Sequence, residues 1–110
     1  MTPITKGRYT ARAADGPDDL RAAQALRARA FGIASGLDAD AFDASTLHVL
    51  IHDHASGTLV CCFRLSLLSG DRIADSYAAQ YYELSALADF EGRMLELGRF
   101  CLHPDRKSVV

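Results

Sequence analysis

A strand-like segment near the end of the chain, residues 94–104, combines apolar residues with a carboxylate, a glycine and a guanidinium. Burying Glu96 and Arg99 in a sheet is costly unless each charge is paired. The two residues are three apart, so a regular strand would point them to opposite faces. A bulge at Gly98 would place both on one face and free a backbone N–H that could stabilise an oxyanion. The segment therefore indicates either a structural ion pair or a cleft in which chemistry occurs.

The pattern along the rest of the chain predicts an α+β fold, with helices packed against a sheet. The predicted elements are, in chain order, a strand at 8–14, a helix at 20–31, a loop at 33–46, a hairpin of strands at 47–52 and 58–68, helical turns at 74–88 and a final strand at 94–102. We expect one domain over residues 8–105, with short tails at 1–7 and 106–110.

Composition excludes several classes of protein. The 110 residues carry a formal net charge of −2, which argues against general nucleic-acid binding. No apolar run approaches the length of a membrane span, and residues 1–10 lack the apolar core of a signal peptide. Of the three cysteines, Cys61 and Cys62 are adjacent, which does not predict a disulfide framework. We therefore expect reduced thiols in a cytoplasmic protein.

Arg27 falls on the apolar face of the predicted helix, seven residues after Leu20 and four before Phe31. A guanidinium that faces the core requires a carboxylate partner, and the candidates are Asp40, Asp43 and Glu96. The alternative is that Arg27 extends to solvent from the edge of that face. The two aspartates flank an aromatic residue, so their loop is either solvated or folded over the sheet, where it would bind a cation or Arg27.

Arg64 interrupts an apolar run in the second strand of the predicted hairpin. Because side chains alternate along a strand, Cys62, Arg64 and Ser66 share one face, which borders a cleft or faces solvent. The four histidines show no spacing typical of a metal site, and the chain has no glycine-rich phosphate loop. We therefore expect no bound metal.

Taken in order, residues 26–31, 40–43, 63–65 and 96–104 resemble the N-terminal half of the ornithine–acyl carrier protein N-acyltransferases. These hemolysin-like enzymes belong to the GNAT superfamily, and the resemblance covers about residues 10–105. The set is also similar to acyl-homoserine-lactone synthases. Those enzymes carry a tryptophan between the first helix and the acidic loop, whereas this chain has none, which favours the lipid-type acyltransferases.

The resemblance implies a GNAT-like mixed, mostly antiparallel sheet with flanking helices that stops after the fourth strand. It implies transfer of a fatty acyl group from an acyl carrier protein thioester to the α-amine of an amino acid such as ornithine, as in ornithine lipid synthesis. The acyl thioester, on the carrier protein or on coenzyme A, is then a donor substrate, and no bound cofactor is implied. The enzyme would be cytoplasmic or peripheral to the inner membrane.

The same resemblance assigns roles to residues. Glu96 would be the general base, acting through water, and the backbone near Gly98 would hold the thioester oxygen as charge develops. The remaining residues would build the amine pocket and hold the loop: Arg27, Phe31, Asp40, Asp43, Arg64 and Arg99.

A GNAT domain continues past the fourth strand, so we expect half of the donor site to lie outside these 110 residues and the chain to be a poor catalyst or none. The strand at 94–102 would be an open apolar edge through which the chain self-associates. Two alternatives stay open. One is a noncatalytic dimerisation module in which Glu96 and Arg27 form a structural ion pair, and the other is an enzyme like the acyl-homoserine-lactone synthases, with S-adenosylmethionine as acceptor.

Overall fold

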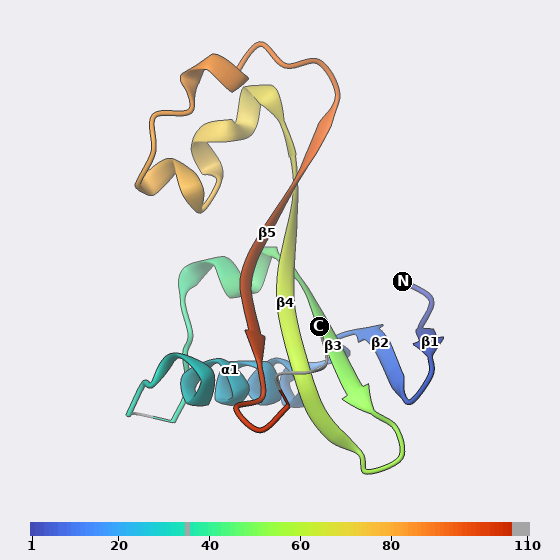
Figure 1. Cartoon of the computed structure of the whole chain (residues 1–110). Helices are drawn as coiled ribbons and strands as arrows, with labels where there is room; N and C mark the ends of the chain where they lie inside the picture. Colours follow the sequence, from blue (N-terminus) through green and yellow to red (C-terminus); the bar gives the residue numbers. More distant parts are fainter. Residues whose placement is uncertain (35, 107–110) are drawn as a thin grey trace.

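A five-stranded antiparallel sheet forms the framework of the protein, whose computed structural model describes residues 1–34 and 36–106. The strands follow one another across the sheet in chain order (Figure 1). They are β1 (Ile4–Lys6), β2 (Tyr9–Ala13), β3 (Leu47–Asp53), β4 (Thr58–Ser69) and β5 (Arg93–Leu102). The α+β prediction is confirmed, although every described neighbouring pair is antiparallel and the sheet is not mixed.

β1 is a strand that the sequence analysis placed in a tail, so the predicted fourth strand is β5. It forms because Gly7, at φ 60°, reverses the chain and lets residues 4–6 pair with β2. The side chains of Thr5 and Thr10 share a hydrogen bond of 3.1 Å across this pair. Of the predicted tail at 106–110, residues 107–110 lie outside the described residues.

The single α-helix among the described residues, α1 (Pro17–Phe31), crosses one face of the sheet (Figure 1). It begins three residues earlier than predicted because Pro17 suits the first helical position and Asp18 and Asp19 favour a helix N-terminus. Asp19 also accepts hydrogen bonds of 2.6 and 2.8 Å from Arg12 of β2, which ties the helix start to the sheet. The helix ends at Gly32, which is left-handed at φ 72°.

Small side chains separate α1 from the sheet. The buried cluster between them consists of Ala23 and Leu26 on the helix, Cys62 on β4 and Cys101 on β5. Because these side chains are short, the helix lies close to the strands, and Arg27 on the same face is carried into the interior. The packing of α1 on the sheet therefore fixes which carboxylates can reach Arg27.

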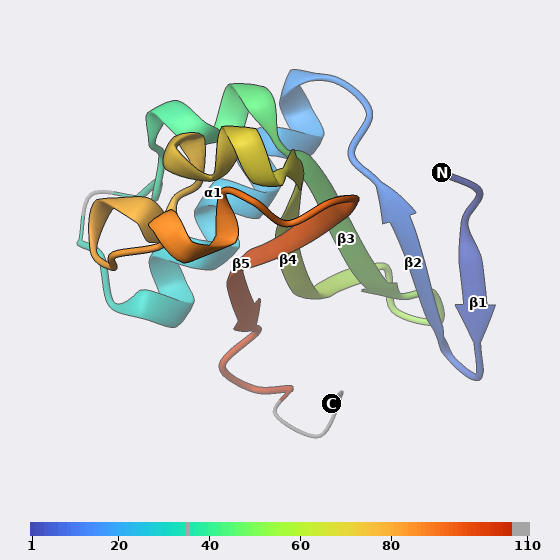
Figure 2. The ribbon, with the colours of Figure 1, turned by 90° about the horizontal axis from the view of Figure 1, so that it is seen from above.

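β4 and β5 form a long twisted hairpin that extends beyond α1 (Figure 1). The predicted helical turns at 74–88 are confirmed as 3-10 turns at its far end: η2 (Gly70–Asp75), η3 (Ala78–Gln80) and η4 (Ser85–Leu87). Gly70 allows these turns to pack against the segment before β5, since a Cβ there would lie only 2.6 Å from the carbonyl oxygen of Phe90. Seen from above, the turns lie on the same side of the sheet as α1 (Figure 2).

The opposite face of the sheet is apolar and uncovered by any described helix. Strand alternation places large side chains there, and several are exposed: Leu47, Leu67, Leu95, Leu97 and Phe100. β5 is also an edge strand, with no described neighbour beyond it. None of the described helices has the length and apolar character needed to cross a membrane.

Candidate active site

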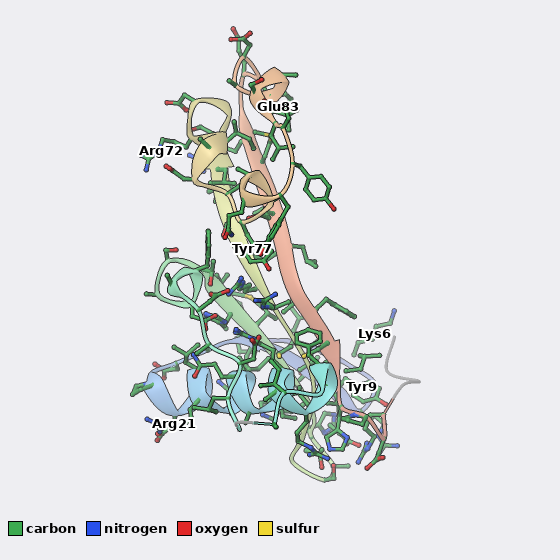
Figure 3. The ribbon with its side chains drawn as sticks, turned by 90° about the vertical axis from the view of Figure 1, so that its left-hand side faces the viewer. Lys6, Tyr9, Arg21, Arg72, Tyr77 and Glu83 are labelled. Atoms are coloured by element: carbon green, nitrogen blue, oxygen red, sulfur yellow. The ribbon has the colours of Figure 1, made fainter. Side chains whose placement is uncertain are left out.

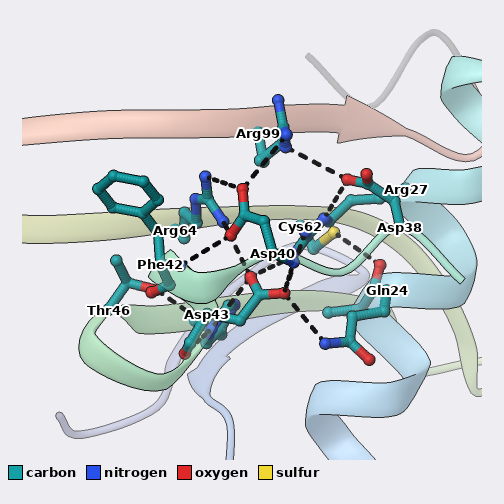
Figure 4. A network of polar contacts seen from close by, with 12 residues as sticks. Gln24, Arg27, Asp38, Asp40, Phe42, Asp43, Thr46, Cys62, Arg64 and Arg99 are labelled. Carbon is teal, nitrogen blue, oxygen red and sulfur yellow. Dashed lines mark hydrogen bonds and ion pairs between the residues drawn. The ribbon is translucent and has the colours of Figure 1, made fainter. Parts of the chain in front are cut away.

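A network of ion pairs joins α1, the loop that follows it and the strands β4 and β5 (Figure 4). Arg27 is 1% exposed, so the alternative in which it extends to solvent is wrong. Its Nε donates to Oδ2 of Asp38 at 2.9 Å, and its Nη1 donates to Oδ1 of Asp43 at 2.7 Å. Of the three predicted candidates Asp40, Asp43 and Glu96, Asp43 is the one that pairs with Arg27, and Asp38 is a further partner.

The acidic loop folds into a single 3-10 turn, η1 (Ala41–Ser45), through its own two carboxylates. Asp40 accepts a hydrogen bond from the backbone N–H of Phe42 at 3.0 Å, and Asp43 accepts one from the backbone N–H of Asp40 at 3.1 Å. This reciprocal capping is encoded by the two acids three residues apart. The loop lies over the sheet, as one of the two predicted alternatives required.

Arg64 binds both of these aspartates from β4. Its Nη1 and Nη2 donate to the two carboxylate oxygens of Asp40 at 2.6 and 3.0 Å, and Nη1 also donates to Asp43 at 2.9 Å. Arg99 approaches from β5, where its Nη2 lies 3.3 Å from Asp40 and its Nε 3.2 Å from Asp38. The three arginines thus face three aspartates, and the interior carries no uncompensated charge from this set.

The pairing keeps Asp40, Asp43 and Arg64 ionised although Asp43 and Arg64 are buried. Burial disfavours the charged form of Asp43, but hydrogen bonds from Arg27 and Gln24 outweigh it and hold the pKa of this carboxyl well below its usual range. The hydrogen bond from Arg64 is the main cause that lowers the pKa of Asp40. Burial also opposes the charge on Arg64, yet its bonds to the aspartates raise its pKa. Asp40, Asp43 and Arg64 are therefore ionised at neutral pH and are not proton donors there, and we call the network of three arginines and three aspartates the charged frame.

A β-bulge interrupts the pairing of β4 and β5 beside this frame. Arg64 is opposite Gly98 and Cys62 is opposite Cys101, so β5 contains one residue more than β4 between these pairs. The bulge was predicted at Gly98, but the left-handed residue is Arg99, at φ 50°. Such a conformation costs a non-glycine residue roughly 1 kcal/mol, and it persists here because the Arg99 side chain is held by the aspartates.

The bulge places Glu96 and Arg99 on one face, as predicted, and both meet the same segment. The Glu96 carboxylate accepts hydrogen bonds from the backbone N–H groups of Tyr77 and Ala78, each at 2.9 Å. Arg99 Nη1 donates to the hydroxyl of Tyr77 at 3.1 Å. No described arginine pairs with Glu96, so the predicted alternative of a structural Glu96–Arg27 pair is wrong.

Tyr77 is a central residue of the site that sequence reasoning missed. Its ring stacks 5.3 Å from the guanidinium carbon of Arg64 and 5.1 Å from that of Arg99, and Figure 3 shows it reaching from the turns toward the middle of the hairpin. No local pattern marks it, because its contacts come from a distant strand. Asp38 was also missed as a partner of Arg27, although it lies in the same acidic loop as Asp40 and Asp43.

Phe31 is not brought to this network. It is the last residue of α1, is 47% exposed, and lines a separate hollow of about 590 Å³ with Phe100 and His103. Arg29 borders the same hollow, with its Nη1 3.2 Å from Nε2 of His103. Among the described residues, no three histidine, cysteine or acidic side chains are grouped so as to hold a metal ion.

Comparison with known proteins fits this geometry. Residues 23–109 match the family described as an acetyltransferase (GNAT) domain. The chain belongs to the GNAT family. It is 32% identical over 118 residues to the L-ornithine N(alpha)-acyltransferase of Rhodobacter capsulatus, a match that covers 90% of this chain. The chain spans 45% of that relative's length. No solved structure matches the chain significantly.

Proposed function

We propose that this chain is part of an N-acyltransferase that moves a fatty acyl group from an acyl carrier protein thioester to the α-amine of an amino acid such as ornithine. The observation that carries the proposal is the meeting of Glu96 and the charged frame at Tyr77, on a chain of the GNAT family. The printed name of the relative, an L-ornithine N(alpha)-acyltransferase, supports the acceptor.

In this proposal Glu96 acts as the general base. Through a water molecule, its carboxylate takes a proton from the acceptor ammonium, and the free amine attacks the thioester carbonyl. The two backbone N–H groups that bind Glu96 hold the carboxylate in one orientation. The carbonyl oxygen becomes negative as the bond forms, and a backbone N–H near Gly98 stabilises it. The carrier's sulfur then leaves as a thiolate with the electron pair of the broken C–S bond, and it takes up the proton that the attacking nitrogen loses.

The outer edge of the frame would bind the acceptor. Asp40 and Arg99 are its partly exposed members, with side chains 24% and 26% exposed. The Arg99 guanidinium, which holds Tyr77 through Nη1 and Asp40 through Nη2, would bind the acceptor's carboxylate. Asp40 would receive an ammonium group. The more deeply buried Arg27, Asp43 and Arg64 would hold the loop in place, since their polar atoms already bind one another.

Phe31 would contact substrate only from the separate hollow that it lines with Phe100. We assign the donor to acyl carrier protein, with coenzyme A as the competing carrier, and place the enzyme in the cytoplasm or at the inner membrane surface, in ornithine lipid synthesis. We also propose that the chain self-associates through the open edge of β5 and its exposed leucines. A single monomeric species in light scattering would contradict this last point.

The test is acyl transfer by the product of the complete gene, with Glu96→Gln as the key variant. We expect kcat to fall by about 10²–10⁴-fold, the usual contribution of a general base, with an unchanged melting temperature. Glu83→Gln is the matched control, because Glu83 lies in the same group of turns and its hydrogen bond among the described residues is local, to Ser85. Product is measured by mass spectrometry with ornithine and with S-adenosylmethionine as acceptors.

A noncatalytic role is the second candidate, and one observation favours it: both Glu96 oxygens are already bound to the backbone of η3 and its cap. In that case Glu96→Gln would lower the melting temperature and leave any residual rate unchanged. The uncovered apolar face would then be an interaction surface of a dimerisation module.

A further inference from the structure

Two of the three cysteines lie against each other in the core beneath α1. Cys62 and Cys101 are direct partners in the pairing of β4 with β5, and their sulfur atoms are 3.4 Å apart. Opposite residues in an antiparallel pair have Cα atoms about 4.5–5.5 Å apart, within the range of about 4.4–6.8 Å that disulfides occupy. The backbone therefore already has the separation that a disulfide needs, and rotation of the side chains would suffice.

Cys61 provides a built-in comparison. It is adjacent in sequence to Cys62 and equally buried, but strand alternation points it to the other face, where its pairing partner is Leu102. Burial raises the pKa of its thiol to about 11, as expected for a cysteine that acts as a small hydrophobic residue.

The surroundings make the Cys62–Cys101 pair asymmetric. The hydrogen bond from Cys62 lowers the pKa of the Cys101 thiol, and the nearby Arg27 guanidinium acts in the same direction while burial opposes both. The pKa of Cys62 is raised in turn by Cys101 and by burial. Cys62 Sγ also lies 3.8 Å from the carbonyl oxygen of Ala23 on α1. Because Cys62 can hold its proton against the Ala23 carbonyl, Cys101 is the thiol of the pair that ionises more readily.

We propose that Cys62 and Cys101 are a modification site, a dithiol that a peroxide converts to a disulfide within the chain. The Cys101 thiolate attacks one oxygen of hydrogen peroxide, the O–O bond breaks, and the released hydroxide takes up a proton to give water and a sulfenic acid. Cys62 sulfur then attacks the sulfenic sulfur and displaces hydroxide, which the Cys62 proton converts to a second water. One peroxide is reduced and two thiols are oxidised.

The position of the pair connects this modification with the bulge. Cys62 is two residues from Arg64 and Cys101 is two residues from Arg99, so the new bond would clamp β4 to β5 directly beside the charged frame. Closing the sulfur separation from 3.4 Å to the bond length of about 2.05 Å would draw the two side chains together under α1. The inference does not depend on the proposed acyl transfer.

The experiment is treatment of the folded chain with hydrogen peroxide, followed by thiol titration and intact mass under non-reducing conditions. We expect two of the three free thiols to disappear, the mass to fall by that of two hydrogen atoms, and dithiothreitol to reverse both changes. Cys61→Ala is the matched control and should keep this behaviour. Cys62→Ala and Cys101→Ala should lose it.

Peptide mapping of the oxidised wild type keeps the inference testable even if the core variants fail to fold. A cross-link between the peptides that contain Cys62 and Cys101 supports the site. Four results would overturn the proposed disulfide. They are three free thiols after treatment, a cross-link through Cys61, a bond between two chains, and sulfinic or sulfonic acids without a disulfide.

Discussion

Asp43 and Asp53 are both buried carboxylates that bind two arginines, yet they stabilise different parts of the molecule. Asp53 is 0% exposed and accepts hydrogen bonds from Arg8 and, at 2.9 Å, from Arg106. Those arginine side chains are 55% and 29% exposed, and they come from the two ends of the described chain. Asp53 therefore joins the two ends of the described chain, and water can solvate both arginines if the carboxylate is removed.

The arginines around Asp43 have no such freedom. The side chains of Arg27 and Arg64 are 1% and 4% exposed, and both belong to elements that pack in the core. Asp40 and Arg99 belong to the same cluster and form its partly exposed edge. The same local chemistry thus ties the chain ends together when the cations are solvated, and joins α1, the acidic loop and β4 when they are buried.

The largest effect should come from removing the acid at the centre of the buried cluster. Asp43→Asn removes the carboxylate that Arg27 and Arg64 share and leaves these buried guanidinium groups only Asp38 and Asp40 as charge partners. We expect a loss of about 3 kcal/mol in the free energy of unfolding. Asp53→Asn should cost clearly less, since Arg8 and Arg106 can turn to solvent. Urea denaturation measures the loss of stability in both variants. An equal or larger loss in Asp53→Asn would contradict the difference between the two clusters.

Acid should reduce the stability that the charged frame contributes to the folded state, at pH values below 3.8. Folding lowers the pKa values of Asp40 and Asp43 below their usual 3.8, so the unfolded state binds more protons there. Their stabilisation is then fully present above pH 3.8 and is lost as the pH falls below it. We expect a decrease on the order of 1 kcal/mol in wild type and a flatter acid limb in Asp43→Asn, measured by denaturation at stepped pH. Equal slopes in the two proteins would contradict the assignment.

Arg99 allows backbone strain to be separated from charge. Arg99→Ala removes the ion pairs but keeps a Cβ at φ 50°, whereas Arg99→Gly removes both. We expect the glycine variant to be more stable than the alanine variant by about 1 kcal/mol. Both should raise the KM for the amino-acid acceptor alike. Equal stability of the two variants would mean that the bulge relaxes when the arginine is lost.

The smallest effect is expected at Gly98. A Cβ there would lie 3.7 Å from Nε of Arg64, an ordinary contact, so Gly98→Ala should change the free energy of unfolding by less than about 0.5 kcal/mol. The transfer rate should also stay within a few-fold, because the backbone N–H is retained. A large loss of rate at unchanged stability would instead show that a substrate must approach the backbone at this position.

Local patterns carried the prediction of most elements. Helical spacing predicted α1, and the residues of the turn at 53–57 predicted the hairpin of β3 and β4. Gly98, between Glu96 and Arg99, predicted the bulge. The prediction missed β1, whose three exposed residues have no apolar alternation and are a strand only because β2 is beside them. It also placed the bulge at Gly98, because glycine inside a strand often marks one, whereas the left-handed residue of the bulge is Arg99, which tertiary ion pairs hold in place.

The sequence by itself determined that Arg27 lies on the apolar face of a helix, because that follows from periodicity alone, and that it needs an acid if that face is buried. Only the tertiary structure decided which acids serve it. The contacts of Arg64 and Arg99 with Asp40 join residues 24 and 59 positions apart, and Tyr77 reaches them from a third segment. Charges attract whatever opposite charge the packing brings near, so the partners follow from the placement of α1, β4 and β5 and not from spacing along the chain.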